Sequence, residues 1–119
     1  MPRDMDDGAL LLDMLEAARE VGGYVTGRTR EEYETDGMLR RSVERVVEII
    51  GEAARGVSAT FRTAHPEVPW QQISATRHIL AHEYGRIDNE IMWRIVTVHV
   101  PELIRLLSPL ISPPPPPSP

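Results

Sequence analysis

The sequence predicts an all-α fold: an antiparallel four-helix bundle with a short extra helical turn and a disordered proline-rich tail. Three observations predict it. Apolar residues recur at three- and four-residue spacing, no segment alternates apolar and polar residues as a half-buried strand does, and the connections are short and polar. The chain has 119 residues, 41% of them hydrophobic, which is enough for one compact domain. We expect that domain over residues 1–111 and the tail over residues 112–119.

The first helix is predicted over residues 8–27, where one apolar face repeats at helical spacing and glycines weaken the end. A short helical turn follows, because Thr29 stands three residues before Glu32 in the pattern of a capping box. The apolar face of the first helix consists of Leu11, Met14, Ala18, Val21 and Val25.

The second long helix is predicted over residues 38–62, the clearest periodic segment of the chain. Arginine and glutamate side chains fall largely outside its apolar stripe, as on a helix with one buried face. The stripe consists of Val43, Val46, Val47, Ile50, Ala54, Val57 and Phe61.

Two further helices complete the predicted bundle. Pro69 suits the first turn of a helix that runs to about Tyr84 and stops at Gly85. Asp88 can cap a last helix over residues 89–110, in which Pro101 is expected to cause a kink. The tail, SPPPPPSP, cannot pack and is expected to be an extended polyproline segment, most simply a solvated one without a partner.

Composition excludes several classes of function. Without cysteine there are no disulfides, thiolate metal sites or cysteine nucleophiles. The net charge of -5 disfavours a protein that coats nucleic acid, so phosphate recognition would have to be local. The acidic start lacks the pattern of a signal peptide, and no apolar run is long enough to span a membrane. We therefore expect a cytoplasmic protein with no membrane contact and no cofactor.

The third helix contains an unusual group of polar residues. Trp70, Ile73, Arg77, Leu80 and Tyr84 share one stripe, so Arg77 occupies a position where the pattern favours leucine. A buried guanidinium needs an acid, an anionic ligand or water as a partner. One alternative is therefore purely structural, an ion pair with Glu48 or Glu52 on the second helix.

The two histidines of this helix raise a geometric difficulty. His78 and His82 lie one turn apart, but no third ligand accompanies them, which makes a metal site a weak hypothesis. Arg77 and His82 are five residues apart, about 140° of rotation on an ideal helix. They could meet at one ligand only if the helix end is distorted or if a second copy of the chain contributes to the same cleft.

The run HPEVPWQQISATRHILAHEYGRIDNEIMWRIVTVHVPELI, with RRSVERVVEIIGEAA before it, resembles the HepT-like branch of the HEPN superfamily. The resemblance extends from about Leu10 to Leu107. Its most specific element is the Arg-x4-His-x-Tyr motif, matched by Arg77, His82 and Tyr84. Such proteins are small, helical and usually encoded beside a minimal nucleotidyltransferase as a type II-like toxin-antitoxin pair.

The resemblance implies a homodimer whose motif helices form one cleft, and a metal-independent endoribonuclease that acts on RNA there. It implies that His82 moves protons and that Arg77 holds the scissile phosphate. The position after the arginine is often asparagine in this family, so the role of His78 is an open question, either a second proton carrier or an orienting group.

The resemblance also implies that the nucleotidyltransferase, acting as antitoxin, transfers AMP to Tyr84 and thereby neutralises the toxin through charge and bulk. Two alternatives remain open. The chain could be a non-catalytic nucleotide- or partner-binding module, conceivably the antitoxin itself. It could also be a plain structural bundle, in which Arg77→Met would be neutral or stabilising.

Overall fold

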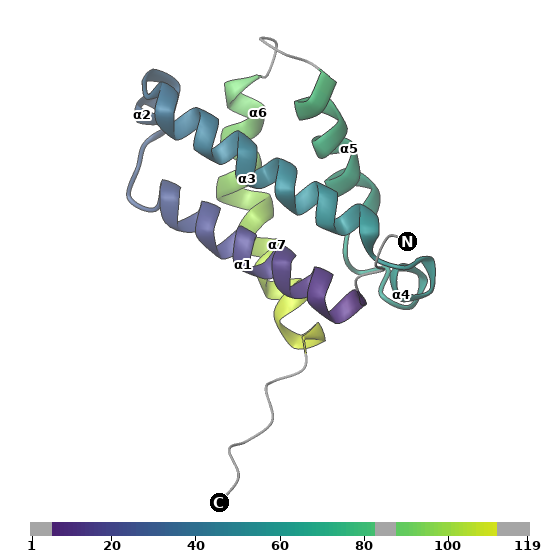
Figure 1. Cartoon of the computed structure of the whole chain (residues 1–119). Coiled ribbons are helices and arrows are strands. Elements are labelled where there is room, and N and C mark those ends of the chain that lie inside the picture. Colours follow the sequence, from purple (N-terminus) through teal and green to yellow (C-terminus); the bar gives the residue numbers. More distant parts are fainter. Residues whose placement is uncertain (1–5, 83–87, 112–119) are drawn as a thin grey trace, which may run out of the picture.

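The computed structural model describes residues 6–82 and 88–111, and over residues 77–82 it describes the backbone alone. Every secondary-structure element within these ranges is a helix, so the prediction of an all-α fold is confirmed. Figure 1 shows α1 (Asp7–Val25) and α3 (Gly37–Gly56) side by side. The tail, predicted over residues 112–119, lies outside the described residues.

Helix α1 forms as its periodicity predicts. Asp6 caps it by accepting a hydrogen bond from the backbone N–H of Ala9 at 2.7 Å, which pairs one of the free donors of the first turn. The predicted apolar face is confirmed, because every one of its members is buried: Leu11, Met14, Ala18, Val21 and Val25.

The short helix α2 (Arg30–Thr35) begins with the predicted capping box. The hydroxyl of Thr29 accepts from the Glu32 N–H at 3.0 Å, and the Glu32 carboxylate accepts from the Thr29 N–H at 2.9 Å. The turn places the Tyr33 ring in the core, where it is 0% exposed and packs on Trp93 with ring centroids 5.6 Å apart. Helix α2 thereby contacts both α3 and α6 (Asn89–Arg94).

The prediction of one helix over residues 38–62 was wrong in one respect. The segment consists of α3, ending at Gly56, and a separate helix α4 (Ala59–Ala64), which Ser58 caps. Asp7 at the start of α1 accepts from the Ser58 N–H at 2.8 Å and from its hydroxyl at 2.6 Å. These hydrogen bonds lower the pKa of Asp7. A contact across 51 residues therefore accompanies the break, which helical periodicity alone could not reveal.

The stripe predicted on α3 is otherwise confirmed. Its aliphatic members are buried in the common core, whereas Phe61 lies on α4 and is half-buried beside that core. The buried members of the stripe are Val43, Val46, Val47, Ile50, Ala54 and Val57.

Helix α5 (Trp70–His82) starts one residue later than predicted. Pro69 precedes the helix, and its carbonyl accepts the first helical hydrogen bond, from the Ile73 N–H at 3.1 Å. Trp70 is buried, and its indole N–H donates to the His65 carbonyl at 2.9 Å. This contact fixes the start of α5 against the preceding loop. The stop predicted at Gly85 lies outside the described residues.

The last helix is nearly continuous, but it contains a π-helical turn where a kink was predicted. Helix α6 leads directly into η1 (Ile95–His99) and then into α7 (Val100–Leu107). Asp88 caps its start, as predicted, by accepting from the backbone N–H groups of the following residues. Pro101 has no N–H and cannot bond to the Thr97 carbonyl, while the Val100 N–H bonds to the Ile95 carbonyl. The proline is therefore accommodated by widening the helix.

The core lies between α1, α3 and the last helix. Helix α1 packs on α3 and α7, whereas α5 packs on α3. A 3-10 turn, η2 (Ser108–Leu110), ends the described chain. None of the helices in the described ranges is long and apolar enough to cross a membrane.

Candidate functional site

The backbone of α5 carries three of the four predicted site residues. Arg77, His78 and His82 lie in the second half of this helix, and their side chains are outside the described part of the structure. Tyr84 lies outside the described residues altogether. The predicted roles of all four therefore stay predictions, as does the ion pair of Arg77 with Glu48 or Glu52.

The first half of α5 is fixed by its contacts, and it sets the direction of the motif. Trp70 is buried, Ile73 is half-buried, and Thr76 donates its hydroxyl to the Gln72 carbonyl at 2.9 Å. The ring of Phe61 meets Trp70 edge-on, with centroids 6.2 Å apart. Helix α5 packs on α3 and is regular from Trp70 to His82. The contacts of its first half therefore set where the backbone of the motif residues lies relative to α3.

A groove lies beside α5, between it and the last helix, and we call it the α5/α7 groove. Its cavity volume is about 360 Å³. Two buried residues of α3, Val47 and Ile50, form its floor. The walls are formed by Pro69, Gln72, Ile73 and Thr76 on one side and by Ile95, His99, Val100 and Leu103 on the other.

The sequence did not predict this groove. Neither His99 nor the pair Gln72 and Thr76 stands out as a candidate site residue in the sequence. The only sequence signal is that Gln72 and Thr76 are four residues apart on the motif helix and flank its apolar stripe. The opposing wall depends on the path of the last helix, which becomes known only in the folded chain.

An apolar stripe on the last helix borders this groove. Ile91 is 58% exposed and Val98 is 54% exposed, and Ile95 between them lines the groove. Large aliphatic residues exposed together on one helix face are typical of a surface that another molecule covers. We call Ile91, Ile95 and Val98 the α6–η1 stripe.

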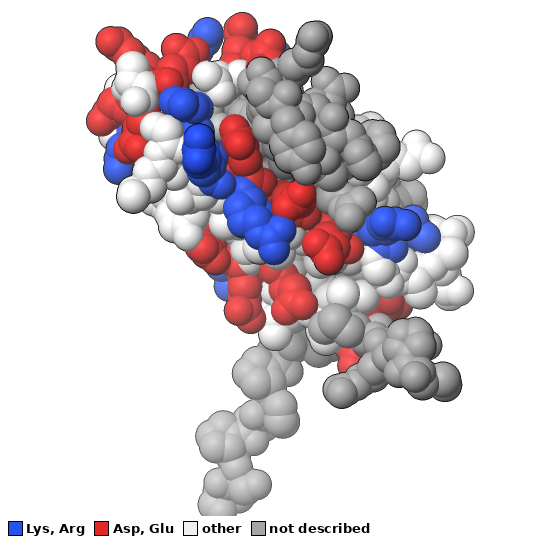
Figure 2. Space-filling view, turned by 45° about the horizontal axis from the view of Figure 1, so that its top comes forward, with Lys and Arg blue, Asp and Glu red and all other residues white. Residues whose placement is uncertain are grey.

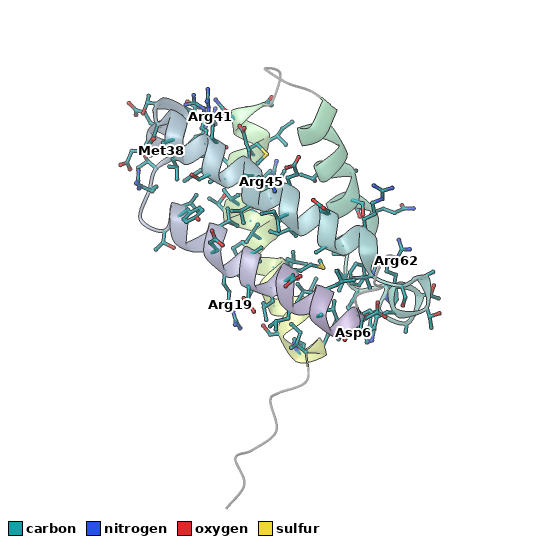
Figure 3. All side chains as sticks on the ribbon, viewed as in Figure 1. Asp6, Arg19, Met38, Arg41, Arg45 and Arg62 are labelled. Carbon is teal, nitrogen blue, oxygen red and sulfur yellow. The ribbon has the colours of Figure 1, made fainter. Side chains whose placement is uncertain are left out.

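On the face that Figure 2 shows, the charges of the described side chains do not form a continuous positive region. Figure 2 shows basic and acidic side chains next to each other along one face of the molecule. Helix α3 accounts for much of this pattern, and Figure 3 shows Arg41 and Arg45 on it. Arg45 is paired with Glu48. A phosphate backbone would therefore meet no broad attractive field on this face.

A second groove, between α1 and α3, is distinctly acidic. Asp13, Glu16 and Glu20 from α1 and Glu52 from α3 line it, with Arg45 as its basic member. This groove would repel RNA. Within residues 6–76 and 88–111, no three histidine, aspartate or glutamate side chains are grouped closely enough to hold a metal ion.

Comparison with known proteins identifies the family. The family model described as "HepT-like: Ribonuclease HepT-like" matches residues 14–110, most of the chain. The chain belongs to the HepT-like ribonuclease family. The match includes α3, α5 and the last helix, and hence both walls of the α5/α7 groove.

Individual relatives agree with the family model. A Methanocaldococcus jannaschii protein named "Putative RNase MJ1380" is 39% identical over 98 residues, which cover 82% of this chain and 90% of the relative. A Thermococcus cleftensis protein named "Probable ribonuclease HepT" is 31% identical over 93 residues, 78% of this chain and 84% of the relative. No solved structure matches the chain.

Proposed function

We propose that this protein is an endoribonuclease that cleaves RNA without a metal ion, at a cleft formed by two copies of the chain. The observation that carries the proposal is the Arg-x4-His-x-Tyr motif, whose Arg77 and His82 lie on α5, in a chain of the HepT-like ribonuclease family. The names of the relatives support ribonuclease activity at the level of the family.

His82 and Arg77 divide the chemistry between them. An imidazole titrates near neutral pH, so His82 can accept the proton of a ribose 2'-hydroxyl as that oxygen attacks the neighbouring phosphate. The bond from phosphorus to the 5'-oxygen then breaks, which leaves a 2',3'-cyclic phosphate and a 5'-hydroxyl. The guanidinium of Arg77 binds two phosphate oxygens and stabilises the charge that develops on them.

A second copy of the chain completes this cleft. Arg77 and His82 are about 140° apart around an ideal helix, so one helix alone does not direct both at one phosphate. The exposed Ile91 and Val98 support a contact between copies through the α6–η1 stripe. In such a dimer the proton for the leaving oxygen comes from a second imidazole, the partner copy's motif histidine or His78.

Regulation follows from the third motif residue. We propose that a minimal nucleotidyltransferase, the antitoxin of a toxin-antitoxin pair, transfers AMP to the Tyr84 hydroxyl. The phenolic oxygen attacks the α-phosphate of ATP, and pyrophosphate leaves. The adenylate adds negative charge and bulk two residues from His82, where the RNA phosphate would bind.

The deciding experiment is cleavage of end-labelled RNA in EDTA by highly purified protein. We expect the wild type to cut and to leave 2',3'-cyclic phosphate ends. His82→Ala should lower the rate by about 10²- to 10⁴-fold, the usual contribution of a general acid or base. His65→Ala is the matched control, because it removes an imidazole that lies before α5, at the end of α4.

The outcomes separate this proposal from its alternative. If folded, dimeric wild type and His82→Ala both fail to cut, the protein is a nucleotide- or partner-binding module without catalysis. The net charge of -5 and the mixed charges over α3 favour that alternative over a general RNA-binding protein. Cleavage that EDTA abolishes would contradict the metal-independent mechanism.

A further inference from the structure

We propose that the α5/α7 groove binds one unpaired base of the RNA, with Gln72 and Thr76 recognising the edge of that base. The inference rests on the proposed function, because Arg77 would hold the phosphate next to this base. It adds a recognition site with its own residues, outside the catalytic motif.

The shape and lining of the groove suit a flat heterocycle. Its volume of about 360 Å³ lies within the usual range of small-ligand pockets. Val47 and Ile50 give it an apolar floor, and Ile73 and Leu103 contribute apolar surface on opposite walls. An unpaired base is usually held in this way, between apolar or aromatic side chains that contact its faces.

The polar groups of the groove suit recognition of a base edge. Gln72 is exposed, and its amide offers both a donor and an acceptor, the combination that pairs with a base edge. Thr76 lies four residues further along α5; its hydroxyl donates to the Gln72 carbonyl, which leaves the oxygen free to accept another hydrogen bond. His99 supplies a third polar group from the opposite wall.

The charge of the α5/α7 groove is also compatible with the binding of RNA. None of the lining residues in the described part of the chain is acidic, whereas the groove between α1 and α3 includes Asp13, Glu16 and Glu20. In a chain with a net charge of -5, a groove whose described lining holds no carboxylate repels a nucleotide less than the acidic groove between α1 and α3 does.

The groove lies at the right level along α5. Thr76 directly precedes Arg77 in the sequence. Ile73 lies four residues before Arg77, which is about one helical turn and a rise of about 6 Å along the axis. A phosphate at Arg77 is thus within one nucleotide of a base in the groove.

On the other wall, the π turn of η1 places Ile95 and His99 at the groove, and such turns are frequent at functional sites.

The test compares cut sites in single-stranded RNA of random sequence. We expect the wild type to favour one base next to the cut, and Gln72→Ala to lower that preference by about tenfold. Gln71→Ala is the matched control, because Gln71 is an exposed neighbour of the same type outside the groove. Thr76→Val is a second test variant, which removes the hydroxyl and keeps the shape of the side chain.

A binding measurement tests the groove independently of catalysis. In the His82→Ala background, an oligoribonucleotide that lacks only the favoured base should bind about tenfold more weakly than the intact one. Adding Gln72→Ala should reduce this difference, and adding Gln71→Ala should leave it unchanged.

Each outcome decides the inference. Cleavage without base preference, or equal preference in the two glutamine variants, would overturn it and leave the proposed ribonuclease intact. Base-dependent binding without cleavage by the wild type would support the groove and reject the ribonuclease. A groove variant that dissociates the dimer and keeps the base preference in the binding measurement would show that a second copy fills the groove, which overturns the inference.

Discussion

Tyr33 is the most deeply buried large side chain whose polar atom has no partner among the described residues. It is 0% exposed, and its hydroxyl makes no hydrogen bond there. Burial, and then the nearby carboxylate of Glu44, raise its pKa to about 12. Burial also raises the pKa of Glu44. The ring stabilises the fold by packing on Trp93, whereas the hydroxyl costs free energy because it has lost water.

We therefore expect Tyr33→Phe to leave the free energy of unfolding at neutral pH unchanged or to raise it by about 1 kcal/mol. The free energy of unfolding of the wild type should also fall as the pH rises from 10 towards 12, because Tyr33 ionises at a lower pH in the unfolded chain than in the folded one. The free energy of unfolding of Tyr33→Phe should fall less over this range, because it lacks this ionising group. Urea denaturation across that pH range measures both effects.

Tyr24→Phe is the control for the measurement at neutral pH, since the Tyr24 hydroxyl is exposed and bonds to Glu20. A marked loss of stability at neutral pH in Tyr33→Phe alone would show that the hydroxyl has a partner after all.

At the scale of elements, the last helix shows how one segment combines structural and surface roles. Periodicity predicted a helix over residues 89–110, and the helix is present, but its apolar residues are too many for one face. Five apolar residues of this helix are buried in the core: Met92, Val96, Val100, Leu103 and Leu107. The remaining aliphatic positions of α6 and η1 form the α6–η1 stripe, which stays partly open to solvent.

We expect the double substitution Ile91→Asp with Val98→Asp to convert the proposed dimer to monomer. Both side chains are more than half exposed, so the folded monomer should tolerate the change, whereas a carboxylate in an apolar interface is costly. Losing the burial of two aliphatic side chains should weaken association by about 100-fold or more. Light scattering after gel filtration measures the mass of the particle.

Leu12→Asp is the matched control, because Leu12 is 42% exposed on α1, away from the stripe. A double variant that stays dimeric would show that the copies meet elsewhere. Cleavage should fall together with dimerisation, since the proposed cleft needs both copies.

At the scale of the whole molecule, charge decides how RNA can approach. The chain carries 13 basic and 18 acidic residues, and the basic residues of α3 alternate with glutamates. Binding must therefore depend on a few local contacts, and an added negative charge near His82 should have a large effect.

We accordingly expect the proposed nucleotidyltransferase partner and ATP to add one adenylate to Tyr84 and to stop RNA cleavage. Intact-mass measurement and peptide mapping would locate the modification. Tyr84→Phe should remain unmodified, and Tyr24→Phe should be modified like the wild type. An adenylate elsewhere, or a modified protein that still cleaves at the wild-type rate, would contradict the proposed regulation.

The sequence by itself determined the helical class, the capping box at Thr29, the cap at Asp88 and the placement of Arg77 and His82 on the third long helix. These features depend on residues within one or two helical turns of each other, and their spacing is visible in the chain. The Arg77, His82 and Tyr84 pattern is of the same local kind, which is why it could be recognised without a structure.

The tertiary structure alone decided where α3 ends, how Pro101 is accommodated, and which aliphatic residues of the last helix stay exposed. It also decided that Gln72 and Thr76 face His99 across a groove. Apart from the π turn at Pro101, these features depend on segments distant in sequence, as where Asp7 bonds to Ser58 across 51 residues. Local spacing carries no information about such contacts, because they form only when the helices pack together.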